Sequence, residues 1–197
     1  MTTRHSIALA ALLLSAASAF AQVSLTPDPT PRLPVQEGQK LPPEDEQFLQ
    51  SAQKMSAAEI NVAKLGIEKA ADPALNALSA DLVAKHEALS KRLQEEASRF
   101  TEPEVKPQTG LLWEADVQRL QSLDGEAFDR EYLSWQMRLH QALVSLYQKQ
   151  ASDTPQIELA KFAITTMNEI QQQFDALKEA GAKHGLKLDA VGQPPQY

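Results

Sequence analysis

Three ionisable side chains lie at positions where the apolar pattern of the sequence calls for apolar residues. Glu59 falls inside a stripe of apolar residues spaced three and four apart, which is the spacing of one helix face. His86 fills a gap in a second stripe, and His140 lies beside a third. Imidazole and carboxylate are ligands that suit Zn, Fe, Ni or Cu(II). The sequence therefore offers Glu59, His86 and His140 as candidate ligands of one divalent transition metal ion.

These residues lie at similar distances along their helices, which favours contact among their side chains. Glu59 lies 13 residues before Asp72 and His86 lies 14 after it, so both lie about 20 Å from that turn at about 1.5 Å per residue. His140 lies near the middle of its own helix. On the last expected helix, the residues near this level are Glu169, Gln172 and Gln173.

Two other interpretations of these polar residues stay open. They can form a buried hydrogen-bonded cluster that fixes the register of the helices, because a buried carboxylate needs partners. Alternatively, the histidines lie at the edge of the core and never meet. The sequence pattern alone does not choose among the three.

Established catalytic motifs are absent from the sequence, so we predict no catalytic residues. The chain lacks Gly-x-Ser-x-Gly, Walker, Gly-x-Gly-x-x-Gly and His-Glu-x-x-His patterns. Positions three before the two histidines hold Val83 and Met137, so the Glu-x-x-His pairs of di-iron bundles are missing. With no cysteine, any metal must be held by nitrogen and oxygen.

Helical periodicity and Pro/Gly punctuation define the elements that would position these residues. Long helices are expected at 44–71, 73–100, 126–150 and 155–181, with Asp72-Pro73 and Thr154-Pro155 as cap followed by first-turn proline. A short helical piece is expected around 111–120, and no strand pattern is present. The connection over 101–125 is long enough to run the length of a bundle, which favours parallel second and third long helices, although a long loop can also double back. These features predict an all-α fold, a ferritin-like four-helix bundle with a long crossover.

The segments on either side of the helical region are expected to be a signal, a linker and a tail. Residues 1–21 combine Arg4, an apolar run and the small-x-small site Ala19-Phe20-Ala21, which predicts a cleaved secretory signal and a periplasmic or secreted protein. Six of the 12 prolines lie between Pro27 and Pro43, so 22–43 is expected to be a linker. The bundle domain is assigned to 44–181 and a tail to 182–197.

Charge and hydropathy restrict the partners. The chain has a net charge of −7, which argues against nucleic acid as a partner because that would favour clustered Lys and Arg. The only long apolar run is the signal itself, so no transmembrane span is expected after its removal. A protein partner in the cell envelope stays open, as does the oligomeric state.

Several motifs together resemble an exported bacterial family named domain of unknown function 4142. The matching residues are Asp45-x-x-Phe48-Leu49-x-x-Ala52, Glu59-Ile60, Ala63-Lys64-Leu65, Leu82-Val83-x-x-His86, and Leu123-x-Gly125-x-x-Phe128-Asp129-x-x-Tyr132 with Gln136 and His140-Gln141. The resemblance covers about residues 45 to 178. It implies a ferritin-like helical bundle behind a secretion signal, with Glu59, His86 and His140 at motif positions. It implies no activity.

Two departures from the family pattern concern the candidate metal site. Lys85 stands where the family usually has Asp before the histidine of the second helix. Asn168 and Gln173 stand where the family usually has a Pro and, five residues on, a His. A three-histidine site would thus be reduced to two, with Gln173 a poor substitute ligand.

The sequence leads to one functional hypothesis and two alternatives. We expect a non-catalytic binding or structural protein of the cell envelope, with stress response or metal handling as the setting. The first alternative is a metal-dependent redox or hydrolytic enzyme that uses Glu59, His86 and His140 as ligands, with an open position for water. The second is an adaptor that presents an apolar helix face to a partner protein.

Overall fold

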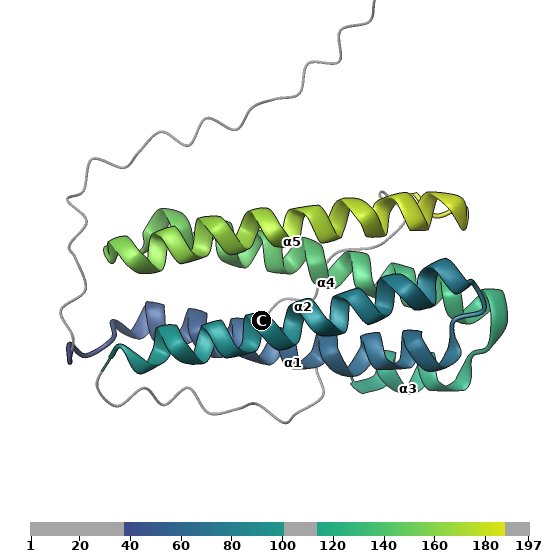
Figure 1. Cartoon of the computed structure of the whole chain (residues 1–197), viewed down its shortest axis with the longest axis horizontal. Coiled ribbons are helices and arrows are strands. Elements are labelled where there is room, and N and C mark those ends of the chain that lie inside the picture. Colours follow the sequence, from purple (N-terminus) through teal and green to yellow (C-terminus); the bar gives the residue numbers. More distant parts are fainter. Residues whose placement is uncertain (1–37, 101–113, 188–197) are drawn as a thin grey trace, which may run out of the picture.

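A computed structural model describes residues 38–100 and 114–187 of the chain. These residues form five α-helices and no strand: α1 (Pro43–Lys69), α2 (Pro73–Ser98), α3 (Glu114–Ser122), α4 (Gly125–Asp153) and α5 (Ile157–Lys183). The four long helices lie side by side, and the short α3 packs on α4 (Figure 1). The all-α prediction is confirmed. The expected signal (1–21), most of the linker, much of the crossover and the end of the tail lie outside the described residues.

Hydrogen bonds at both ends of the bundle fix the helix directions. Asp45, in the first turn of α1, accepts a hydrogen bond at 3.0 Å from the hydroxyl of Thr154, just after α4. Asp129, in the first turn of α4, accepts from the backbone N–H groups of Ala71 and Asp72, just after α1, both at 3.0 Å. α1 and α4 are therefore antiparallel. Because α2 reverses α1, α2 and α4 run parallel, as the long connection predicts.

The predicted apolar stripes line the interior of the described structure. On α1 and α2 they bury Phe48, Ala52, Met55, Val62, Leu75, Leu82, Leu89 and Leu93. On α4 and α5 they bury Phe128, Tyr132, Trp135, Leu139, Ala163, Ile170 and Leu177. Within the described residues, no helix has both the length and the apolar character needed to cross a membrane.

The two predicted Pro-initiated helix starts have different outcomes. Asp72 caps α2 as expected, since its carboxylate accepts from the N–H of Ala74 at 2.8 Å and Pro73 opens the helix. The start of α5 was predicted at Pro155 and is wrong, because the helix begins at Ile157. The hydroxyl of Thr154 donates to Asp45 on α1 and accepts from the N–H of Gln156. This contact with α1 holds Thr154, the residue predicted to cap the helix, so that two residues separate it from the first residue of α5.

The predicted end of α5 at Gly181 is also wrong. Gly181 lies inside the helix against Met137, where a Cβ would come within 3.1 Å of the Met137 side chain. Helix α5 ends at Lys183, and Gly185 just after it has a φ of +72°. The N–H of Gly185 bonds Ala182 and that of Leu186 bonds Gly181, which is the Schellman pattern of a helix end.

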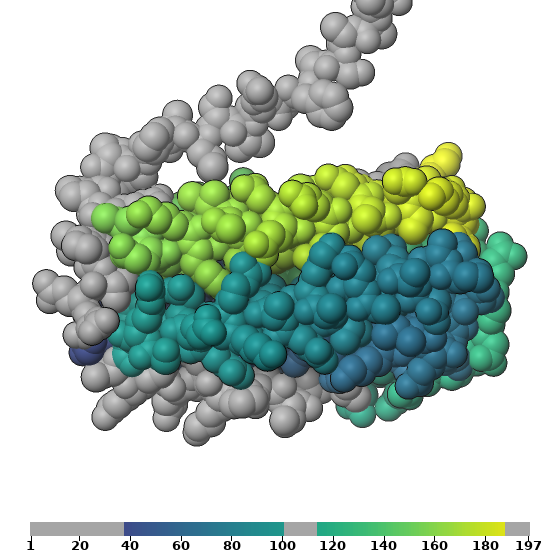
Figure 2. Space-filling model, in the orientation of Figure 1, coloured from purple at the N-terminus to yellow at the C-terminus, as the bar shows by residue number. Residues whose placement is uncertain are grey.

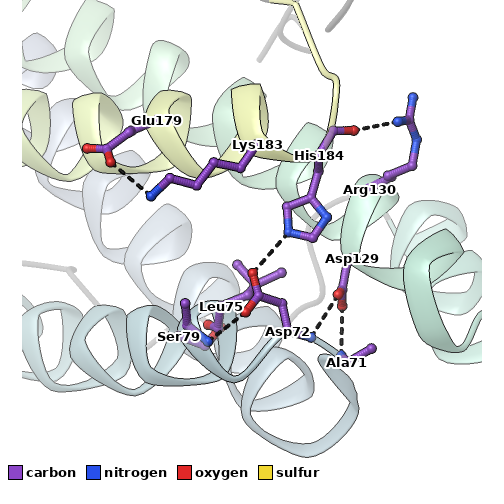
Figure 3. Close-up of polar contacts among 10 residues, drawn as sticks. Ala71, Asp72, Leu75, Ser79, Asp129, Arg130, Glu179, Lys183 and His184 are labelled. Carbon is purple, nitrogen blue, oxygen red and sulfur yellow. Dashed lines mark hydrogen bonds and ion pairs between the residues drawn. The ribbon is translucent and has the colours of Figure 1, made fainter.

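Residues 182–186 belong to the folded body, at the end of the bundle that holds the α1–α2 turn. The imidazole of His184 lies 3.2 Å from the carboxylate of Asp72, and Arg130 donates to the carbonyl of His184 (Figure 3). Leu186 packs against the core. The tail boundary at 182 is therefore too early by several residues.

Candidate functional site

All three candidate ligands lie in the interior, at the middle of the bundle. Glu59 on α1, His86 on α2 and His140 on α4 are each 0% exposed to solvent. The interpretation that places the histidines at the edge of the core is therefore wrong. Their burial raises the question of which groups satisfy them, because an unpartnered buried polar group is costly.

His86 and His140 meet on one amide of α5. The Nε2 atom of His86 lies 3.0 Å from the side-chain oxygen of Gln173, and that of His140 lies 3.3 Å from the same atom. The two rings stand edge to face, with centroids 5.7 Å apart. Gln173 thus joins α2, α4 and α5 through a single carboxamide.

The hydrogen bonds of the other ring nitrogen fix the tautomer of His140. Its Nδ1 lies 2.9 Å from the carbonyl oxygen of Gln136. A carbonyl can only accept, so Nδ1 carries the proton and, in a neutral ring, Nε2 is an acceptor. Two acceptors cannot bond each other, so we assign the Gln173 amide with its oxygen and nitrogen exchanged, which puts the NH₂ group at the position 3.3 Å from His140.

The same orientation of Gln173 also satisfies His86. An amide NH₂ has two hydrogens, so one serves each Nε2 atom. His86 then carries its proton on Nδ1, which donates to the hydroxyl of Ser56 on α1 at 3.4 Å. The result is two neutral imidazoles whose Nε2 lone pairs point at one position, with the Gln173 amide in that position.

Burial keeps both histidines neutral over the physiological range. Removal from water, together with a smaller effect of the nearby His140, lowers the pKa of His86 to about 3. Burial lowers the pKa of His140 to about 4. Loss of hydration penalises the charged imidazolium, because no carboxylate lies against either ring to compensate within the described residues.

Glu59 lies in a different part of the polar centre, beside Gln136. Burial raises the pKa of its carboxyl to about 8, and the Gln136 side chain lowers it only in part. As an ionised group, Glu59 would find no donor for either oxygen among the described residues, and the side-chain oxygen of Gln136 lacks one too. A protonated Glu59 that donates to Gln136 supplies the missing hydrogen.

Protonation of Glu59 completes a chain of hydrogen bonds that runs in one direction. The NH₂ of Gln136 donates to the hydroxyl of Tyr132 at 2.9 Å. The Tyr132 hydroxyl lies 2.8 Å from that of Ser79, which donates to the carbonyl of Leu75. Each donor in the chain has an acceptor only if Tyr132 donates to Ser79. The chain links α1, α4 and α2.

Gly66 makes room for this chain where α1 passes closest to it. A Cβ built on Gly66 would lie 2.3 Å from the Ser79 hydroxyl and 2.6 Å from the Tyr132 ring. Any larger residue would force both side chains away. The glycine therefore lets the Tyr132–Ser79 hydrogen bond form against the α1 backbone.

Two of the three predicted ligands come together, and Glu59 lies apart from them beside Gln136. Within residues 38–100 and 114–187, no three His, Asp or Glu side chains gather closely enough to hold a metal ion. The two imidazoles have the chemistry of a metal site, since both Nε2 atoms are free of protons. The amide nitrogen of Gln173 lies between them, however, and Glu59 is neutral. The three-residue metal site stays a prediction that requires Gln173 to move.

Sequence reasoning identified Gln173 by its height along the last helix but not its role between the histidines. Ser56 was missed entirely. Gln136 entered only through the family resemblance, although a spacing of four before His140 is the signal that could have found its carbonyl. Tyr132, named above only in the family resemblance, contributes its hydroxyl to the network.

A profile of the family described as "Domain of unknown function (DUF4142)" matches residues 30–180. The match covers most of the chain, so the chain belongs to this family. No curated protein and no solved structure matches the chain.

Proposed function

We propose that this member of the DUF4142 family is an exported, non-catalytic binding or structural protein of the cell envelope, built as a ferritin-like four-helix bundle. The observation that carries the proposal is the state of the polar centre. His86 and His140 are fully buried, neutral and bonded to one amide. A catalytic group needs contact with substrate, and these two side chains are closed off from solvent.

The polar centre has a structural role in this proposal. Gln173 bonds residues of α2 and α4, and the chain through Gln136, Tyr132 and Ser79 bonds residues of α4 and α2. A protonated Glu59 that donates to Gln136 would add α1. A shift of any helix by one turn would leave several of these groups buried without partners, at about 1–3 kcal/mol each. The network thus favours one register among the many that similar apolar stripes would permit.

Export is proposed from residues 1–21 alone. The apolar run and the Ala19-Phe20-Ala21 site support cleavage after Ala21. Expression of the full chain in a Gram-negative host, followed by mass spectrometry of the periplasmic fraction, should give a mature protein that begins at Gln22. Retention of the full-length chain in the cytoplasm would contradict export.

A metal-binding role is the second candidate, and the convergent Nε2 atoms favour it. If Gln173 turned away, His86 and His140 would offer two unprotonated nitrogens to a transition metal ion, and Glu59 could add an oxygen after losing its proton. The metal would supply Lewis-acid or redox chemistry in the enzyme alternative. The protein's own residues would hold and orient it.

One pair of measurements separates the two candidates. A bound metal stabilises the folded state, so a chelator lowers the melting temperature of a metal protein. We expect the mature protein, purified without a His tag, to contain sub-stoichiometric metal and to melt at the same temperature with and without chelator. His86→Ala should leave the metal content unchanged. Stoichiometric metal that His86→Ala removes would instead establish the metal role.

The adaptor alternative receives no support from the described surface. It requires a contiguous apolar patch on the outside of the bundle. Among the described residues, the large apolar side chains that are more than about one third exposed are Ile67 on α1 and Ile164 on α5. Two separate side chains do not form such a patch.

A further inference from the structure

The seam between α2 and α5 holds a groove that leads to the polar centre. These two helices pack much less closely than α1 with α2 or α4 with α5. The groove has a volume of about 320 Å³ and is lined by Lys85, Ala88, Leu89 and Arg92 of α2 and by Glu169, Ile170, Gln172 and Gln173 of α5. Figure 2 shows α2 and α5 meeting along this face of the molecule. A volume of this size is in the lower range for sites that bind small molecules.

The groove has an apolar floor with one polar group. Leu89 and Ile170 are buried and provide apolar wall, and Gln173 is 6% exposed. The NH₂ group of Gln173 faces the two histidines, so its carbonyl oxygen remains for the groove. The floor therefore presents a hydrogen-bond acceptor, which a ligand can meet with a hydroxyl or amino hydrogen.

Cationic side chains lie at the rim. Arg92 reaches across the seam to Glu169, with one N–H···O distance of 3.1 Å, and Lys85 pairs with Asp81 at 2.6 Å. All of these groups are partly exposed, so the pairs contribute little stability and can exchange partners. A guanidinium can bond a second carboxylate, because it has five N–H donors. The rim thus complements an anionic group on a ligand.

We propose that this groove binds a small organic acid with an apolar body, a carboxylate at one end and a hydrogen-bond donor at the other. The carboxylate lies against Arg92 at one end, the body lies on Leu89 and Ile170, and the donor bonds the carbonyl of Gln173 at the other end, where Lys85 also lines the groove. Ligand sites of this kind are mostly apolar with a few placed polar groups, and they occur between the helices of bundles. This inference names a ligand for the binding role proposed above and rests on it.

4-Hydroxybenzoate is a suitable probe, because it carries all three features. Titration into the ¹⁵N-labelled mature protein should give saturable shifts of amide signals from α2 and α5 around the groove. Benzoate lacks the donor and phenol lacks the carboxylate, so each should bind about tenfold more weakly. Equal affinity for the three probes would contradict the assigned contacts. No saturable shift at millimolar probe would overturn the site.

Variants locate the binding. Ala88→Trp fills the groove from an exposed position and should abolish binding of 4-hydroxybenzoate. The matched control is Ala80→Trp, an exposed alanine of α2 that does not line the groove, and it should bind normally. Arg92→Gln should weaken 4-hydroxybenzoate but not phenol. Binding that survives Ala88→Trp would refute this location. Chelator-sensitive melting would instead refute the non-catalytic proposal, so the two failures are distinguishable.

Discussion

His86 on α2 and His140 on α4 stand edge to face, with ring centroids 5.7 Å apart and ring planes at 80°. Both rings direct Nε2 at Gln173 on α5. Two buried imidazoles without a carboxylate between them would be costly if charged, and burial holds the pKa of each well below its usual value. The pair therefore acts as a neutral hydrogen-bonding unit that depends on one amide.

Removal of that amide should destabilise the bundle. Gln173→Leu keeps the approximate volume but leaves two buried Nε2 acceptors without donors, and each costs about 1–3 kcal/mol. Gln172→Leu is the matched control, because Gln172 also lines the groove but bonds neither histidine. Urea unfolding should show a free-energy loss of several kcal/mol for Gln173→Leu. Similar small losses for both variants would contradict the role of Gln173.

The protonation of Glu59 should appear in the pH dependence of stability. Its folded pKa is raised from 4.5 to about 8, so the folded state holds a proton that the unfolded state releases. The stabilisation from this proton is complete below about pH 4.5 and is lost as the pH rises toward 8. Between these values, the free energy of unfolding of wild type should fall by up to about 1.4 kcal/mol per pH unit relative to that of Glu59→Gln.

The test compares the free energies of unfolding of wild type and Glu59→Gln from pH 5 to 8. The difference between them isolates Glu59 from other titrating groups. Glu95→Gln makes the same charge change at an exposed position of α2 and serves as the control. A difference that stays constant with pH would mean that Glu59 is ionised in the folded protein.

Two helical glycines should respond to alanine in opposite ways. Gly66→Ala places a Cβ against the Ser79 hydroxyl and the Tyr132 ring, and such overpacking costs about 1–3 kcal/mol. Gly181→Ala meets only the flexible end of Met137 at 3.1 Å. There, the better helix propensity of alanine, worth up to about 1 kcal/mol, should leave the protein unchanged or more stable. Thermal unfolding measures the stability of both variants. A loss of stability in Gly181→Ala but not in Gly66→Ala would contradict this prediction.

Local patterns were sufficient to predict the four long helices and to place Glu59, His86 and His140 on or beside apolar stripes. Helix periodicity depends on neighbouring residues, and so does the capping of α2 by Asp72. The start and end of α5 were mispredicted because they depend on contacts remote in sequence. Asp45 holds the hydroxyl of Thr154, and the space beside Met137 accommodates Gly181 inside the helix.

The position of the candidate site along the helices was predictable from the sequence. The contacts between its side chains were not. Counting residues placed His86, His140 and Gln173 at one height, because the helical rise is constant. The rotation of each helix about its own axis decides which side chains meet. The sequence pattern does not define this rotation accurately enough to pair individual residues. As a result, Glu59 was grouped with the histidines, whereas its polar neighbour is Gln136.

The ¹⁵N NMR spectrum of the imidazole nitrogens tests the neutral polar centre most directly. In the metal-free mature protein, both rings of the pair should show a protonated Nδ1 and an unprotonated Nε2 from pH 7 down to about pH 5. Their folded pKa values of about 3 and about 4 leave them neutral throughout this range. Titration of either His86 or His140 near the ordinary pKa of about 6.5, or a proton on Nε2 of either ring, would contradict the account.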